Sequence, residues 1–191
     1  KASPAFQDHQ SLSDEMRRCI RATLASVMLP VPSRAPSQPH ARHEVVSAWA
    51  LRPVTGMGEN LLSALARVPP TLAGPLAQTL GGHHGAWPPG DRFNPLKLTV
   101  DDRGGSEWCS VRADLVAEMH RLFPHPAFPT FTPDTRRDNV MLTLLSAIVS
   151  IADWIGSDER VFRLEQDYPS SDAYLEASLA LAEKAVVATG L

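Results

Sequence analysis

The sequence has 191 residues, 43% hydrophobic and 20% charged, which is enough for one large domain or two small ones with a buried core. Its formal net charge of −3 offers no basic excess of the kind with which proteins bind nucleic acid unaided, although bound metal ions would add positive charge. Cys19 and Cys109 lack metal-binding or redox spacing, and residues 1–7 do not resemble a signal or transit peptide, so we expect a reduced, cytoplasmic compartment.

Apolar residues recur at helical spacing in stretches that end at proline, glycine or capping residues. In chain order, the predicted helices run from the capping signal at 11–14 to Pro30, and then over 43–51, 58–68, 71–80, 111–122, 138–155 and 170–190. Loops are predicted over 30–41, 85–104 and 123–133. Because no stretch alternates with period two, the sequence predicts an all-α helical bundle with long loops, in a single domain over 1–191.

Two adjacent histidines, His83 and His84, lie between glycines at the end of the predicted helix over 71–80. Neighbouring side chains on a helix point about 100° apart, so such a pair rarely serves one structural purpose. Where the helix gives way to glycine-rich backbone, both rings can turn inward toward a ligand. Residues 80–85 alone favour the alternative, a glycine C-cap with two solvated histidines near the helix dipole.

The predicted helix over 138–155 is apolar on most of its surface. Four polar residues share one narrow face: Thr143, Ser146, Ser150 and Asp153. We interpret it as a buried core helix, because 140–155 is short for a membrane span and carries an aspartate. A buried carboxylate must be paired or bind a metal ion. For Asp153, a metal site, a salt bridge to Arg136 or Arg160, and a hydrogen bond to a neighbouring helix all stay open.

His43, with Glu44 beside it, opens the predicted helix over 43–51 and by itself is typical of a solvated or capping residue. The remaining histidines are assigned to loops and surfaces: His9, His40, His120 and His125. Asp101 and Asp102 are assigned to a hydrated turn rather than a metal site. The absence of GxGxxG, P-loop, GxSxG and CxxC motifs excludes dinucleotide, nucleoside-triphosphate, serine-hydrolase and zinc-ribbon sites.

One hypothesis unites these residues: His43, His83, His84 and Asp153 lie on separate helices and converge in the core of the bundle. Mixed imidazole and carboxylate ligands suit Mn²⁺, Fe²⁺, Co²⁺, Ni²⁺ or Zn²⁺. A site of this kind lowers the pKa of bound water and polarises a phosphoryl oxygen.

Three segments carry a resemblance to a known family: 1–7 (KASPAFQ), 82–85 (GHHG) and 152–157 (ADWIGS). In this order they resemble the HD-nuclease domain of the CRISPR-associated helicase–nuclease of type I interference systems. The segment 152–157, continuing into Asp158 and Glu159, is the most specific of the three. The likeness covers nearly all of the chain, including the closing helix that in the family precedes a helicase.

The resemblance implies an all-α HD fold with two divalent transition-metal ions (Mn, Fe, Co or Ni, with Mg as a further candidate) that cuts single-stranded DNA. The residues carried over are His83 and His84 as paired histidine ligands, His43 as the histidine ligand before them, Asp153 as the late aspartate ligand, and Lys1 as the lysine after the His-Asp-x-Gly motif. His43, His83 and His84 would hold one ion, and Asp153 would help to hold the other. The implied partners are single-stranded DNA, a helicase module on the same or a separate chain, and the RNA-guided surveillance complex, without a membrane.

The sequence departs from the family in one respect, because it begins at that lysine and lacks the upstream His-Asp dyad. We expect upstream residues to be missing from this sequence, rather than the chain to be a naturally short form, since lysine is not a natural initiator. We expect weak or no cleavage by the chain as written. Two other functions stay open. One is an HD phosphohydrolase of nucleotides or cyclic nucleotides, which needs a closed basic pocket, and the other is a metal-free helical docking module.

Overall fold

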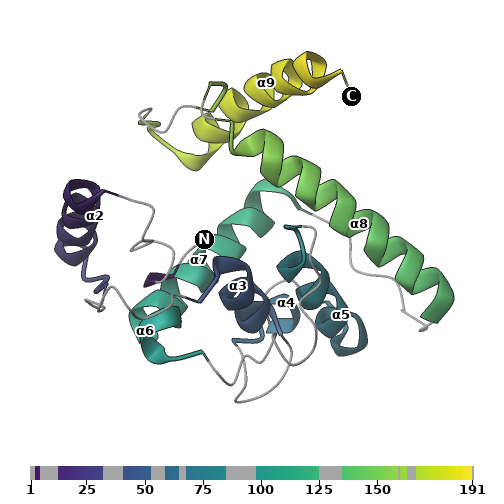
Figure 1. The fold of residues 1–191 in the computed structure, drawn as a ribbon, viewed down its shortest axis with the longest axis horizontal. Helices are drawn as coiled ribbons and strands as arrows, with labels where there is room; N and C mark the ends of the chain where they lie inside the picture. Colours follow the sequence, from purple (N-terminus) through teal and green to yellow (C-terminus); the bar gives the residue numbers. More distant parts are fainter. Residues whose placement is uncertain are drawn as a thin grey trace.

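The computed structural model of the chain describes residues 3–4, 13–31, 41–52, 59–64, 68–84, 98–124, 135–158, 160–162 and 167–190. These residues form helices and no strand (Figure 1). In chain order the helices are α2 (Asp14–Ser26), α3 (His43–Leu51), α4 (Leu61–Ala64), α5 (Pro70–Gly81), α6 (Val100–Arg103), α7 (Ser106–Leu122), α8 (Thr135–Gly156) and α9 (Ser171–Thr189). The prediction of an all-α fold is confirmed over the described residues.

Helix α3 packs against α5 and α4 (Figure 1). Ala48 on α3 and Ala73 and Ala77 on α5 have no exposed surface, and such small side chains permit the helices to approach closely. The hydrophobic core comprises Trp49, Ala50 and Leu61, with Leu51, Leu98, Ala113 and Val116 packed around it. This packing brings the N-terminus of α3 to the C-terminus of α5, where the predicted histidines lie.

The segment that leads into α3 is tied to α6 through Asp102. The carboxylate of Asp102 accepts hydrogen bonds from the backbone N–H of Thr99 (2.9 Å), the hydroxyl of Thr99 (2.7 Å) and the backbone N–H of Ala41 (3.2 Å). The contacts with Thr99 form a capping box at the start of α6. Asp102 is buried, so the prediction of a hydrated turn is wrong for this residue, because backbone donors take the place of water.

A buried ion pair joins α7 to the segment before α4. Arg112 Nε donates to Glu59 Oε2 at 2.8 Å, Arg112 Nη2 donates to Glu59 Oε1, and Arg112 Nη1 donates to the carbonyl of Arg103 at 2.7 Å. The guanidinium carbons of Arg103 and Arg112 lie 4.9 Å and 5.9 Å from the ring centre of Trp49. The opposite charges of Arg112 and Glu59 therefore neutralise each other beside the hydrophobic core, and the ring of Trp49 adds cation–π attraction.

Gly104 makes the turn from α6 to α7. Its φ is +80°, and a Cβ atom at this position would lie 2.2 Å from Cδ1 of Trp108, so only glycine fits. Trp108 is buried and donates its indole N–H to the carbonyl of Pro30 at 2.9 Å, which ties the segment after α2 to α7. The predicted loop over 85–104 thus ends in the short helix α6, while residues 85–97 lie outside the described part.

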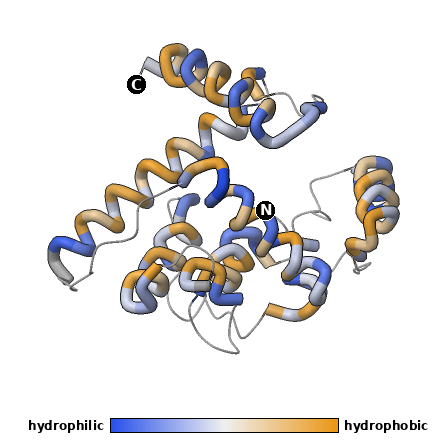
Figure 2. Tube along the Cα trace, turned by 180° about the vertical axis from the view of Figure 1, so that it is seen from behind, coloured by the Kyte–Doolittle hydropathy of each residue, from blue (hydrophilic) through white to orange (hydrophobic). Residues whose placement is uncertain are grey.

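Helix α8 is not buried all round, contrary to the interpretation of its sequence as a core helix. Leu142 and Ser146, one turn apart, are buried, and Asp153 is half-buried two turns further on, whereas Thr143 is exposed. Most of the helix is coloured as hydrophobic in Figure 2, and its large apolar side chains are exposed at Val140, Met141, Leu144, Ile148, Ile151 and Trp154. The helix packs against α5 and α9, which cover part of its circumference.

Helix α8 also has the length and apolar composition of a membrane-spanning helix. Among the described residues, one window, Arg137–Gly156, is long and apolar enough to cross a membrane, with a mean hydropathy of 1.6 and 6% of it buried. The prediction that this segment is too short is therefore wrong. A single window of this kind is weak evidence for a span, because core helices of soluble proteins pass the same test.

The predicted helix ends agree best with the structure where a capping residue is present. Ser13 and Ser170 cap α2 and α9 by accepting hydrogen bonds from backbone N–H groups three residues on, each at 3.2 Å, and Gly190 closes α9 with φ of 74°. The helix expected over 58–68 begins only at Leu61, because Asn60 has a φ of 57°. Helix α8 begins at Thr135, three residues before the predicted start, so Asp138 lies within its first turn.

Candidate metal centre

The end of α5 turns two histidines toward the start of α3. Helix α5 closes with Gly81 and Gly82, both buried, and the N–H of Gly82 donates to the carbonyl of Thr79 at 3.0 Å. His83 and His84 follow in the turn, while His43 is the first residue of α3. The pair therefore lies where helix gives way to turn, as predicted, and faces a third imidazole about forty residues earlier in the chain.

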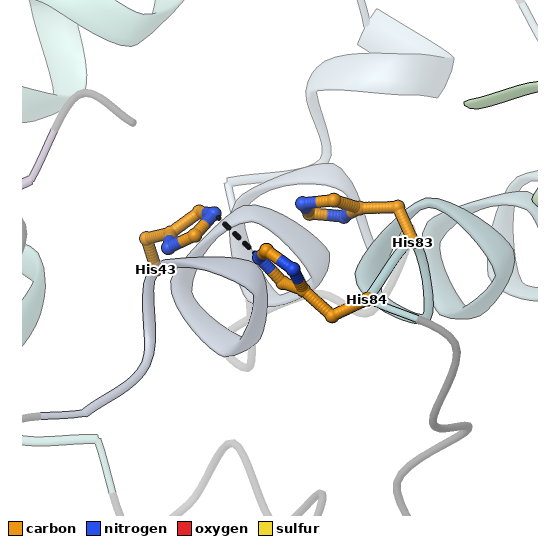
Figure 3. A group of neighbouring side chains, drawn as sticks. All are labelled: His43, His83 and His84. Carbon is orange, nitrogen blue, oxygen red and sulfur yellow. Dashed lines mark hydrogen bonds between the residues drawn. The ribbon is translucent and has the colours of Figure 1, made fainter. Parts of the chain in front are cut away.

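The three imidazoles surround one small volume (Figure 3). Their ring centres lie 4.4 Å apart for His83 and His84, 5.1 Å for His43 and His84, and 5.5 Å for His43 and His83. One nitrogen from each ring lies within 4.8 Å of the other two. His43 and His83 are half-buried and His84 is exposed, so one side of the cluster is open to solvent.

Neighbouring groups distinguish the two nitrogens of each ring. His83 Nδ1 lies 2.5 Å from the carbonyl oxygen of Leu80, so this nitrogen donates and leaves Nε2 as the ligand atom. His43 Nδ1 lies 3.4 Å from Glu44 Oε2, on the side of the ring away from His84. The Nε2 atoms of His43 and His84 lie 3.3 Å apart. The cluster thus presents Nε2 from all three rings as its ligand set.

The distance between two of these nitrogens fits a bound metal ion. Metal–imidazole bonds of about 2.0–2.1 Å at a tetrahedral angle place two ligand nitrogens about 3.3–3.4 Å apart. The observed separation of His43 Nε2 and His84 Nε2 is 3.3 Å. Imidazole suits Zn, Cu, Fe and Ni, and three protein ligands with an exposed side leave room for water or substrate. The residues present therefore fit one transition-metal ion.

The remaining predicted site residues lie elsewhere. Asp153 is half-buried on the inner face of α8 and makes its own polar contacts, but among the described residues the close group consists of the three histidines. Its assignment to a second ion stays a prediction. Lys1 lies outside the described residues, although Ser3 and Pro4 just after it are buried.

A cavity of about 150 Å³ opens beside His43. Its walls are mainly apolar, and the residues that line it are Ser3, His43, Val46, Ser47, Ala50, Leu51, Leu61, Arg112, Leu115 and Val116. The lining cation, Arg112, is bonded to Glu59. The cavity is therefore not the closed basic pocket that recognition of a small phosphorylated substrate requires.

Sequence reasoning left the roles of Glu44 and the pair Glu59–Arg112 unassigned, and it assigned Asp102 to a hydrated turn. Asp102 carried a local signal, because Thr99 three residues before it completes a capping box. Glu59 and Arg112 are 53 residues apart and lack any shared local pattern, so only the packed structure could identify their contact.

Comparison with known proteins gives the family. The family model for the HD domain of Cas3 matches residues 1–162. The chain belongs to the Cas3 HD-domain family. The matched segment includes every candidate metal ligand, and the resemblance drawn from segments 1–7, 82–85 and 152–157 is thereby confirmed.

Two relatives of this Cas3 HD domain are much longer proteins. One is the CRISPR-associated endonuclease/helicase Cas3 of Thermus thermophilus, 30% identical over 121 residues, which are 62% of this chain and 13% of the relative. The other is a solved structure, the crystal structure of a CRISPR-associated protein, with a TM-score of 0.75 and 30% identity. It matches 100% of this chain and 19% of that one. The chain thus spans less than a fifth of the length of these relatives.

Proposed function

We propose that this HD domain is a metal-dependent nuclease domain that degrades single-stranded DNA in type I CRISPR interference. The observation that carries the proposal is the three-histidine cluster, His43, His83 and His84, in a chain of the Cas3 HD family. The similar Thermus thermophilus protein bears the name endonuclease/helicase. An HD fold with these ligands is suited to hydrolysis of a phosphodiester bond.

The residues of the chain have separate tasks in such a reaction. His43, His83 and His84 hold one divalent transition-metal ion, and Asp153 on α8 is assigned to a second ion, as in the family resemblance. A bound ion of this type activates water and polarises a phosphoryl oxygen. The exposed side at His84 admits the substrate backbone, and phosphate contact of this kind does not depend on base identity.

Two alternatives have less support. A nucleotide phosphohydrolase would need a cationic pocket, whereas the cavity beside His43 is mainly apolar and its arginine is paired with Glu59. A metal-free docking module would not require three imidazoles gathered around one small volume.

The proposed partners are single-stranded DNA, a helicase module on the same or another chain, and the RNA-guided surveillance complex. We also propose a cytoplasmic location, in keeping with the absence of metal-binding or redox spacing between Cys19 and Cys109. In this proposal the exposed apolar side of α8 does not enter a membrane.

The test is degradation of circular single-stranded DNA in the presence of Mn²⁺, Co²⁺ or Ni²⁺. Two forms are compared: the chain as printed, and the chain extended by the upstream His-Asp dyad that the resemblance implies. We expect the extended form to cut DNA and His83→Ala in that form to abolish cutting. Glu107→Ala, an exposed position on α7, is the matched control and should cut normally. Metal binding without DNA cleavage, together with hydrolysis of small phosphate esters, would favour the phosphohydrolase instead.

A further inference from the structure

Glu44 is a buried carboxylate next to the histidine cluster, beside Nδ1 of His43. Its side chain is 7% exposed, and it is the second residue of α3, next to His43. A buried charge needs partners, because its removal from water is costly. Its two oxygens have different partners: Arg42 pairs with Oε1, and His43 Nδ1 lies 3.4 Å from Oε2.

The position of Oε2 determines which nitrogen of His43 can bind a metal ion. An anionic acceptor beside Nδ1 favours the tautomer that carries its proton on Nδ1. Nε2 then keeps its lone pair, and this is the atom that lies 3.3 Å from His84 Nε2. Metal-bound histidines commonly have a carboxylate or a carbonyl at the other ring nitrogen, and His83 has the carbonyl of Leu80 in that place.

We propose that Glu44 is a positioning residue that holds His43 with its proton on Nδ1 and its Nε2 directed into the cluster. Arg42, whose side chain is largely exposed, holds the other carboxylate oxygen and so orients Oε2 toward the imidazole. The inference rests on the proposed metal site for its purpose. The tautomer itself does not depend on DNA cleavage.

The first experiment measures Mn²⁺ and Co²⁺ affinity of the unaltered chain, Glu44→Ala and Glu44→Gln. We expect Glu44→Ala to weaken binding about 10–100-fold, the usual effect of losing such a partner. Glu44→Gln should recover part of the loss, because its amide oxygen can accept the same proton. The matched control is Glu107→Ala, which removes the carboxylate of the second residue of α7 and should leave metal affinity unchanged.

The second experiment determines the His43 tautomer by ¹⁵N NMR of the metal-free chain, at a pH where the imidazoles are neutral. We expect Nδ1–H in the unaltered chain and in Glu107→Ala, and a shift toward Nε2–H in Glu44→Ala. Nε2–H in the unaltered chain, or the same tautomer in Glu44→Ala, would overturn the proposal. If the form extended by the upstream dyad binds metal but cuts no DNA, the nuclease proposal fails while these measurements still decide the role of Glu44.

Discussion

At the scale of single residues, the ion pair of Glu59 and Arg112 alters the chemistry of a neighbouring thiol. Burial raises the pKa of Cys109 above its usual value, and Glu59 raises it further by hydrogen bonding and charge. Arg112, whose Nη2 lies 3.7 Å from the Cys109 sulfur, opposes the shift without cancelling it. Because a raised pKa means less thiolate at a given pH, Cys109 is a poor nucleophile in the folded chain.

We therefore predict that Cys109 reacts several-fold more slowly with iodoacetamide at pH 8 than the exposed Cys19. Peptide mass spectrometry over a time course measures both rates in one sample. In denaturant the two rates should converge, which is the control. Glu59→Gln should accelerate the reaction at Cys109, because Arg112 would then act on the thiol without an opposing carboxylate. Equal rates in the folded chain would contradict the prediction.

At the scale of elements, polar contacts supplement apolar packing where helices meet. Arg121 on α7 donates to Asp172 on α9 at 3.1 Å and 2.9 Å and to Glu118 on its own helix at 2.8 Å and 2.7 Å. Between α7 and the segment before α4, by contrast, the bonded pair of Arg112 and Glu59 is buried. These two pairs differ in solvent exposure, so we expect different energetic effects.

Removal of Arg112 should be strongly destabilising. Arg112→Ala leaves Glu59 buried without its partner, and we expect a loss of about 3–5 kcal/mol in the free energy of unfolding. Arg121→Ala, the exposed control, should cost far less, because solvent screens its ion pairs. Replacing both members of the buried pair, with Arg112→Met and Glu59→Leu, should cost less than Arg112→Ala. Denaturant titrations measure these values, and equal losses at Arg112 and Arg121 would contradict the argument.

The exposed contact between α7 and α9 should depend on pH. Hydrogen bonds from Arg121, and then from Ser171, lower the pKa of Glu118 to about 2. A depressed carboxylate pKa means that the stabilisation is present above the unfolded-state value near 4.5 and is lost as pH falls toward 2. NMR titration of the Glu118 carboxyl should show this low pKa, and Arg121→Gln should raise it toward normal. An unchanged pKa in Arg121→Gln would assign the shift to another cause.

At the scale of the whole molecule, the histidine cluster connects distant parts of the chain. His43 and the pair His83–His84 are brought together because α3 packs on α5. A metal ion held by all three would link the two helices in the folded state only. Binding to the folded state alone shifts the folding equilibrium toward it.

A bound metal ion should therefore stabilise the chain. At a free Co²⁺ concentration 100 times Kd, we expect about 2.7 kcal/mol, or roughly a 5–10 °C rise in Tm for a domain of this length. EDTA should reverse the rise, and His84→Ala should abolish it. Because His84 is exposed, this variant should retain nearly the Tm of the unaltered metal-free chain. A rise of the same size in His84→Ala would place the metal elsewhere.

Much of the helical content could be predicted because its signals are local. Ser13 and Ser170 cap helices through backbone groups within three residues, and Gly82 ends α5 beside the histidine pair. Part of the candidate site could be predicted in the same way. The adjacency of His83 and His84 is a property of the sequence, whereas the inclusion of His43 was a hypothesis, supported by a family resemblance, until the packing of α3 on α5 was known.

The sequence by itself determined most of the helical segments and where the paired histidines emerge, because hydrogen-bonding caps, glycine breaks and helical periodicity act over a few residues. The tertiary structure alone decided that α8 is covered on part of its surface, that Asp102 bonds the distant backbone N–H of Ala41, and that Glu59 meets Arg112. It also set Glu44 behind His43 with its carboxylate buried. Burial and ion pairing depend on which helix faces meet, and residues far apart in the chain make those contacts.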